Sequence, residues 1–167
     1  MSDPTPRSRS IFQYAVVLVI IAVVAAFLFD ALYYAQEQAE RTVMEATVRN
    51  MGSGLKIEVA TRTMHGQEAS IRQLIGANPV QWLEKPPDGY TGICQQELAP
   101  GGWCFDAATH EIVYRPRVDR HLEYLESGRP GLRWRVGSAA EIAARQSSSP
   151  APGGAIRLYS TTSFAWH

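Results

Sequence analysis

Residues 11–50 read IFQYAVVLVIIAVVAAFLFDALYYAQEQAERTVMEATVRN, contain no Gly and no Pro, and change from apolar to amphipathic near Asp30. Tyr14 to Phe29 is an unbroken apolar run, close to the roughly 20 residues that a helix needs to cross a bilayer. We therefore predict a transmembrane helix over residues 11–32 that continues outside the membrane over residues 33–66.

Two other structures produce an apolar run near the start of a chain. A secretory signal peptide has a shorter apolar region that ends at a small-x-small cleavage site, whereas here Ala25 and Ala26 are followed by Phe27, Leu28 and Phe29. A core helix that is apolar on every side needs a much larger protein around it. Both patterns fit this run less well than an uncleaved anchor does.

The charges that flank the run predict its orientation. Arg7 and Arg9 precede it, whereas Asp30 and Glu37 are the first charges after it. Positive charge favours the cytoplasmic side. We expect residues 1–10 to stay in the cytoplasm and the rest of the chain to lie on the other side of the membrane.

Beyond Asp30 an apolar stripe recurs at steps of three and four residues, as one face of a helix requires. The predicted helix core face consists of Met44, Val48, Met51, Leu55 and Val59. Other faces place an acid four residues before a base, Glu45 with Arg49 and Glu58 with Arg62, which favours ion pairs along the helix. Gly52 and Gly54 weaken the interior of this helix and are a candidate hinge.

The chain has 167 residues and a formal net charge of zero. Once the membrane segment is set aside, this length suffices for one small domain. No excess of Lys and Arg is present for the counterion release that drives nucleic-acid binding, so we expect no nucleic-acid partner.

Cys94 and Cys104 are the only cysteines, and both fall in the part predicted to lie outside the cytoplasm, where disulfides persist. A disulfide between them is the favoured interpretation. Two free buried thiols or a partial metal site are the alternatives, and the spacing matches no two-residue ligand knuckle of a zinc site.

The rest of the chain is predicted to be a loop region with one short helix over residues 67–100, followed by a sheet region over residues 101–167. Pro79, Pro86 and Pro87 limit regular structure in the former. The latter carries about four strands, the last of them in AIRLYSTTSFAW, and a Ser/Pro/Gly loop at 146–154. The predicted fold is α+β, a long N-terminal helix packed on a small C-terminal antiparallel sheet.

Motifs of catalysis are missing from this sequence: it has no Gly-rich phosphate loop, no G-x-S-x-G and no H-E-x-x-H. We expect no catalytic residues, no cofactor, no metal and no small-molecule substrate. The most suggestive polar group is Asp119, His121 and Glu123, which would share one face of a strand and could hold an ion or serve a tethered hydrolase. A solvated edge is the simpler interpretation. Five aromatic residues are better explained as core than as a ligand platform: Trp103, Tyr114, Trp134, Phe164 and Trp166.

This order of elements resembles the type IV pilin and type II secretion pseudopilin superfamily. The resemblance rests on VVLVIIAVVAAFLFDALYYAQEQAERTVMEATVRNM, which is similar to a pilin N-terminal helix, and on GGWCFDAATHEIVYRP, which looks like a pseudopilin hairpin. It implies a pilin-like fold, a bacterial inner-membrane location with a periplasmic domain, and a non-catalytic subunit or accessory of a pilus or secretion machine. The implied partners are membrane lipid and other pilin-like or assembly proteins, reached by helix packing and surface recognition.

The chain departs from the family pattern at its N-terminus. Family members are processed after a Gly that precedes a Phe and carry a Glu at the fifth mature position. Here Ser10, Ile11 and Phe12 have no Gly before them, Ala15 or Val16 stands where the Glu would fall, and no acidic cluster matches the family's calcium site. This departure favours the alternative function, a stand-alone single-pass periplasmic binding or sensory module that joins no filament.

Overall fold

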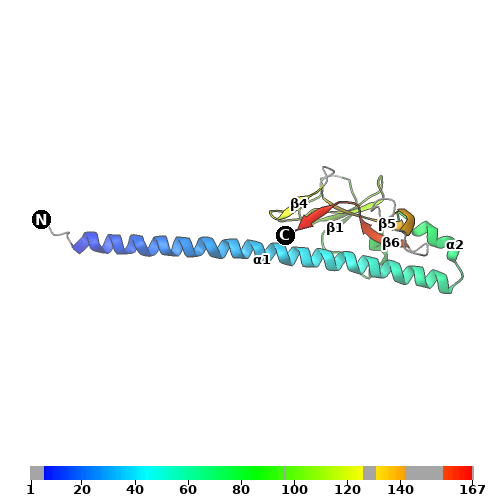
Figure 1. The fold of residues 1–167 in the computed structure, drawn as a ribbon, viewed down its shortest axis with the longest axis horizontal. Coiled ribbons are helices and arrows are strands. Elements are labelled where there is room, and N and C mark those ends of the chain that lie inside the picture. Colours follow the sequence, from blue (N-terminus) through cyan, green and yellow to red (C-terminus); the bar gives the residue numbers. More distant parts are fainter. Residues whose placement is uncertain (1–5, 96, 126–130, 142–155, 167) are drawn as a thin grey trace. The chain divides into compact units, whose positions relative to one another are not determined.

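The computed structural model describes residues 6–95, 97–125, 131–141 and 156–166, with side chains from residue 12 onward. Within these ranges, one long helix, α1 (Pro6–Met64), is followed by short helical turns and seven strands (Figure 1). This arrangement confirms the predicted α+β class. Contacts divide the chain into two compact units, Met1–Ala39 and Glu40–His167. The predicted loop at 146–154 lies outside the described residues.

The first unit contains the apolar part of α1. The helix begins at Pro6, five residues before the predicted start, because proline has the backbone angle of a helix and lacks only an N–H that the first turn leaves unbonded anyway. Its apolar side chains are exposed, with Phe27 at 74 %. Among the described residues, one helix, α1, is long and apolar enough to cross a membrane.

The second unit begins with the amphipathic part of α1. Met44 and Met51 are buried in one core cluster, against which Val48 packs, and Leu55 is buried in a second cluster, against which Val59 packs. The helix is continuous across both interior glycines and ends at Met64.

The end of α1 is closed by backbone hydrogen bonds at a glycine. Gly66 has a φ of +68°, its N–H bonds to the Thr63 carbonyl, and the Gln67 N–H bonds to the Arg62 carbonyl. This pair of bonds at a left-handed glycine is the Schellman arrangement that stops a helix.

The segment after α1 returns along the helix in three short turns. These are α2 (Glu68–Ile71), η1 (Arg72–Leu74) and η2 (Pro79–Trp82). The side chain of Asn78 accepts a hydrogen bond from the Val80 N–H and so caps η2, with Pro79 at its first position.

Two sheets follow, and they differ from the prediction in three places. The five-stranded sheet has the order β1-β2-β3-β5-β6, from Tyr90–Ile93, Trp103–Asp106, Glu111–Tyr114, Leu132–Ser138 and Ile156–Ser160. The smaller sheet pairs β4 (Leu122–Tyr124) with β7 (Phe164–Trp166). β1 lies in the predicted loop region and runs parallel to β2, so the larger sheet is mixed rather than wholly antiparallel. The predicted final strand is two strands, because the chain turns after Ser160, whose hydroxyl bonds to the Thr162 carbonyl.

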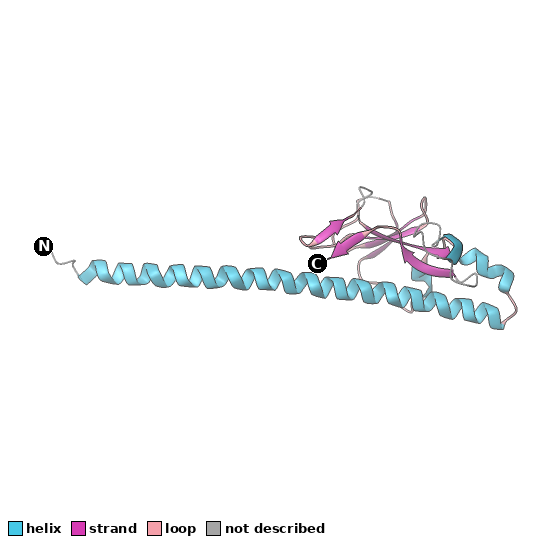
Figure 2. Ribbon diagram, in the orientation of Figure 1, coloured by secondary structure: helices cyan, strands magenta, loops and turns pink. Residues whose placement is uncertain are grey.

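The larger sheet packs one face on α1, as Figure 2 shows for the strands beside the C-terminal part of the helix. Trp103, Ile112 and Trp134 belong to the core beneath this inner face. The five aromatic residues named above are all part of that core or packed against it. The opposite face, which we call the outer face, carries alternate residues of the same strands: Cys104, Asp106, Glu111, Val113, Arg133 and Arg135.

Candidate functional site

The acidic and histidine group suggested by the sequence does not form one face of a strand. β4 begins at Leu122, so Asp119 and His121 precede it, and only Glu123 lies within it. The Asp119 carbonyl accepts the Leu122 N–H, which makes this segment a turn. Within the described ranges, no three His, Cys, Asp or Glu residues are placed to hold a metal ion.

The two cysteines form a disulfide at the edge of the larger sheet. Cys94 follows β1, Cys104 lies in β2, and their Cα atoms are 5.1 Å apart. The Cys94 N–H also bonds to the Phe105 carbonyl at 2.9 Å. Cys104 is only 3 % exposed. The disulfide therefore links the parallel edge strand β1 to its neighbour β2.

A cavity of about 440 Å³ opens on the outer face, and the disulfide forms part of its wall. Val113 and Pro116 add apolar wall, and Asp106, Arg115 and Arg133 add charge. Its volume falls in the range of ligand-binding pockets, which are about 300–1,000 Å³ and combine apolar walls with a few polar groups. This cavity is the candidate functional site.

Arg133 is the most enclosed charged group of the cavity, with a side chain 14 % exposed. One terminal nitrogen donates to Asp106 at 3.2 Å and to Glu111 at 3.1 Å. Burial acts to raise the pKa of Asp106, but hydrogen bonds from Thr109, Arg133 and Ala108 outweigh it and hold that pKa below its ordinary value. The charge of this cation is balanced by two carboxylates, although its buried Nε–H has no hydrogen-bond partner among the described residues.

The second guanidinium of the cavity, Arg115, is also paired. It donates to the Leu98 carbonyl at 2.7 Å and to Glu97 at 2.9 Å. Neither arginine of the cavity is thus left as a free positive charge.

Asp119 and Tyr124 complete the cavity wall on one side. Burial raises the pKa of the Tyr124 hydroxyl, a hydrogen bond from the Gly131 backbone opposes this, and the negative charge of Asp119 adds to the rise. Asp119 therefore lies close enough to act on the ring electrostatically. No ion pair joins it to any residue that the structure describes.

The sequence did not predict the hydrogen bonds that link the helix to the sheet region. Glu40 accepts hydrogen bonds from the Tyr114 hydroxyl at 2.7 Å, the Arg117 N–H at 2.6 Å and the Val118 N–H at 3.2 Å. Burial and this hydrogen bond from Tyr114 to Glu40 raise the pKa of Tyr114. The sequence contains one sign of this contact, the acidic residue Glu40, which lies one helical turn before the apolar stripe begins at Met44.

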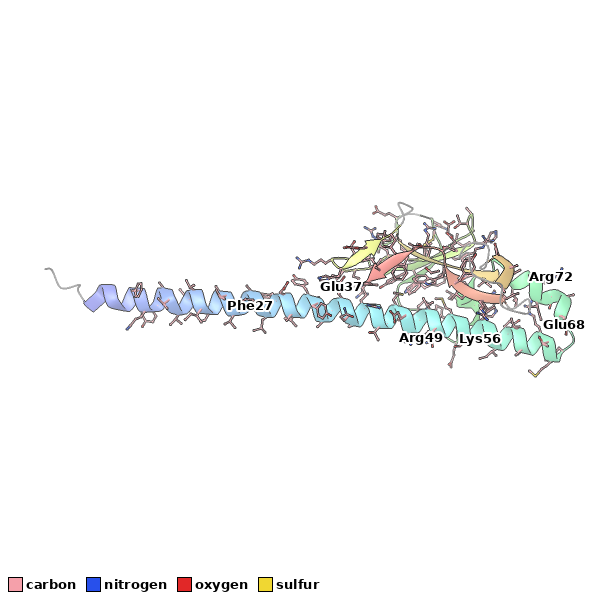
Figure 3. The ribbon with its side chains drawn as sticks, in the orientation of Figure 1. Phe27, Glu37, Arg49, Lys56, Glu68 and Arg72 are labelled. Atoms are coloured by element: carbon pink, nitrogen blue, oxygen red, sulfur yellow. A yellow bond between two sulfur atoms is a disulfide. The ribbon has the colours of Figure 1, made fainter. Side chains whose placement is uncertain are left out.

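The face of α1 opposite the sheet carries cations. Arg49 and Lys56 point away from the sheet in Figure 3, and neither has a partner among the described residues. The predicted pair of Glu45 with Arg49 does not form. Glu45 pairs instead with Arg41 at 2.9 Å, because Arg41 is also held by the Trp166 carbonyl. The predicted pair of Glu58 with Arg62 forms at 2.8 Å.

Over the described residues, this arrangement offers a walled cavity, a neutralised outer face and an exposed cationic helix face. Comparisons with protein-family models, with curated proteins and with solved structures found no match for the chain.

Proposed function

We propose that this protein is a single-pass inner-membrane protein that acts as a non-catalytic, pilin-like or pseudopilin-like subunit or accessory of a type IV pilus or type II secretion system. One observation carries the proposal. A single helix exposes apolar side chains along its first part, and the same helix provides the core of a folded domain from Met44 onward.

The exposed apolar surface supports the anchoring half of this proposal. Phe12, Leu18, Phe27 and Phe29 are each more than 60 % exposed. A contiguous apolar surface of this length is unfavourable in water and favourable in lipid. The charges beside it, Arg7 and Arg9 before and Asp30 after, favour a cytoplasmic N-terminus and a periplasmic domain.

Small residues and unpaired charges support the assembly half. Ala22, Ala25 and Ala26 allow close approach of another helix in lipid. Arg49 and Lys56 leave an exposed cationic face on the part of α1 that carries the domain. Together with the resemblance of the helix and the hairpin to pilin-like proteins, these features favour lateral packing with similar subunits.

The second candidate function is a stand-alone anchored module that binds a ligand or reports a signal. The cavity on the outer face favours it, because its volume and its mixed apolar and charged walls are typical of a ligand pocket. The missing Gly before Phe12 favours it as well. Under this alternative α1 acts as a stalk.

Photo-crosslinking in intact cells separates the two. A photoreactive residue is placed at Val19, at Ala26 or at Val43, all exposed on α1. Val43 is 66 % exposed, whereas Met44 is 2 % exposed and would report only on its own core. A probe at Met51, which is fully buried, is the matched control.

Capture of other pilin-like proteins or their membrane platform at all three exposed positions, and not at Met51, is the result that the assembly proposal predicts. Capture of lipid alone would contradict it and leave the stand-alone module as the better account.

A further inference from the structure

Part of the wall of the cavity on the outer face is apolar. Its walls include the Cys94–Cys104 disulfide, Val113 and Pro116. Cys104 and Val113 are buried and lie opposite each other in the paired strands β2 and β3, so this wall belongs to the sheet itself. An aliphatic stem placed along such a wall leaves water and gains contacts on both sides.

The charge balance of the cavity is negative. Three carboxylates, those of Glu97, Asp106 and Asp119, and two guanidiniums, those of Arg115 and Arg133, line it. Asp106 and Glu97 are each bonded to one of the arginines. Asp119 is the carboxylate that remains without an ion pair in the described part of the chain, so the free charge in the cavity is an acceptor for a cation.

An aromatic ring lies beside this free carboxylate. Tyr124 is 42 % exposed and lines the same cavity, and the charge of Asp119 acts on its hydroxyl. An aromatic ring and a carboxylate in one cavity suit a planar guanidinium, which can stack on a ring and donate two hydrogen bonds to an acid.

We propose that this cavity binds the side chain of an arginine exposed on a partner protein. The aliphatic stem would lie along the disulfide and Val113, and the guanidinium would pair with Asp119 and stack on Tyr124. The inference rests on the proposed function, because the bound arginine belongs to a partner that this protein recognises through its surface.

Other side chains fit less well. A lysine supplies the charge and the stem but lacks the planar, bidentate head. An acidic side chain meets a carboxylate with no free arginine to receive it. A wholly apolar side chain would take water from Asp119 without giving it a partner, which is costly for a charged group.

The test is a titration of the full-length protein in detergent micelles with three capped tripeptides. Ac-Gly-Arg-Gly-NH2 is the probe, and the versions with Lys and with Gln at the centre are the comparisons. Methyl NMR signals of Val113 and Leu98 report on the cavity, and Val136, buried in the core on the helix side, is the internal control.

We expect the arginine peptide to shift the Val113 and Leu98 signals with a dissociation constant on the order of 1 mM, more tightly than the lysine peptide, with no shift at Val136. Asp119→Asn should weaken binding about tenfold or more, since it removes a charge-assisted pair. Asp88→Asn, at an acid 96 % exposed and away from the cavity, is the matched control and should have no effect. Tyr124→Leu should reduce the preference for arginine over lysine.

Equal shifts with the glutamine peptide, or binding that Asp119→Asn leaves unchanged while the Val136 signal shows an intact core, would overturn the inference. Because the titration uses purified protein, it is independent of the crosslinking in cells. Loss of filament partners there would reject the assembly proposal and leave this result standing.

Discussion

Gly54 of α1 lies against the backbone of Trp82 in η2, so closely that a Cβ atom at Gly54 would stand 2.6 Å from the Trp82 carbonyl oxygen and 2.9 Å from its Cβ. The glycine that weakens the helix on propensity is thus the position at which the returning segment docks on it. This contact explains how the loop after α1 is held against the helix, and it argues that Gly54 serves packing rather than bending.

Gly54→Ala should destabilise the domain by about 1–3 kcal/mol, because the extra methyl meets backbone that cannot move cheaply. Gly52 has nothing within 4 Å of its Cβ position, so Gly52→Ala should stabilise by up to about 1 kcal/mol through helix propensity. Urea unfolding of the full-length protein in micelles, followed by tryptophan near-UV circular dichroism, measures both. Equal effects of the two substitutions would show that the contact with Trp82 is unimportant.

The Glu40 and Tyr114 hydrogen bond predicts a loss of stability at alkaline pH. The pKa of Tyr114 is raised in the folded state by burial and by Glu40, so above about pH 10 the unfolded chain gives up a proton that the folded chain keeps. This contribution to stability is complete below pH 10 and declines as the pH rises toward the folded pKa. In the same unfolding assay, the stability difference between pH 9 and pH 11 should shrink in Tyr114→Phe. An unchanged difference in that variant would mean that Tyr114 is not the group responsible.

Removing the disulfide should free the edge strand β1. Replacing Cys94 and Cys104 by alanine is expected to destabilise the domain by about 2–3 kcal/mol, the chain-entropy cost of a short closed loop. In that variant, hydrogen exchange should increase at the backbone N–H of position 94, which bonds to the Phe105 carbonyl in the unaltered protein, and much less at Val136 in β5. In the unaltered protein, thiol labelling of the unfolded, unreduced chain should find no free cysteine.

Most of the structural features that could be predicted from the sequence follow from the local periodicity of its apolar residues. The stripe from Met44 to Val59 follows the helical repeat, and the alternation of Leu132, Trp134 and Val136 follows the strand repeat, so each element reveals its buried face without knowledge of its partner.

The features that could not be predicted from the sequence depend on contacts between residues that are far apart along the chain. β1 is four residues long, contains Gly92 at a φ of +84°, and becomes a strand only by pairing in parallel with β2. Arg41 pairs with Glu45 because Arg41 also donates a hydrogen bond to the carbonyl of Trp166, a residue distant in the sequence. The cavity likewise joins residues from separate segments, and only the fold brings Asp119 to the disulfide wall.

We propose that one helix both anchors the protein and builds its domain outside the cytoplasm. This proposal is tested most directly by placing single cysteines at Ser8, Phe27 and Lys56 and treating intact spheroplasts with a membrane-impermeant maleimide. The account predicts labelling of Lys56→Cys at once, of Ser8→Cys only after permeabilisation, and of Phe27→Cys only after the protein is denatured in detergent. Immediate labelling of Phe27→Cys, or protection of Lys56→Cys in intact spheroplasts, would contradict it.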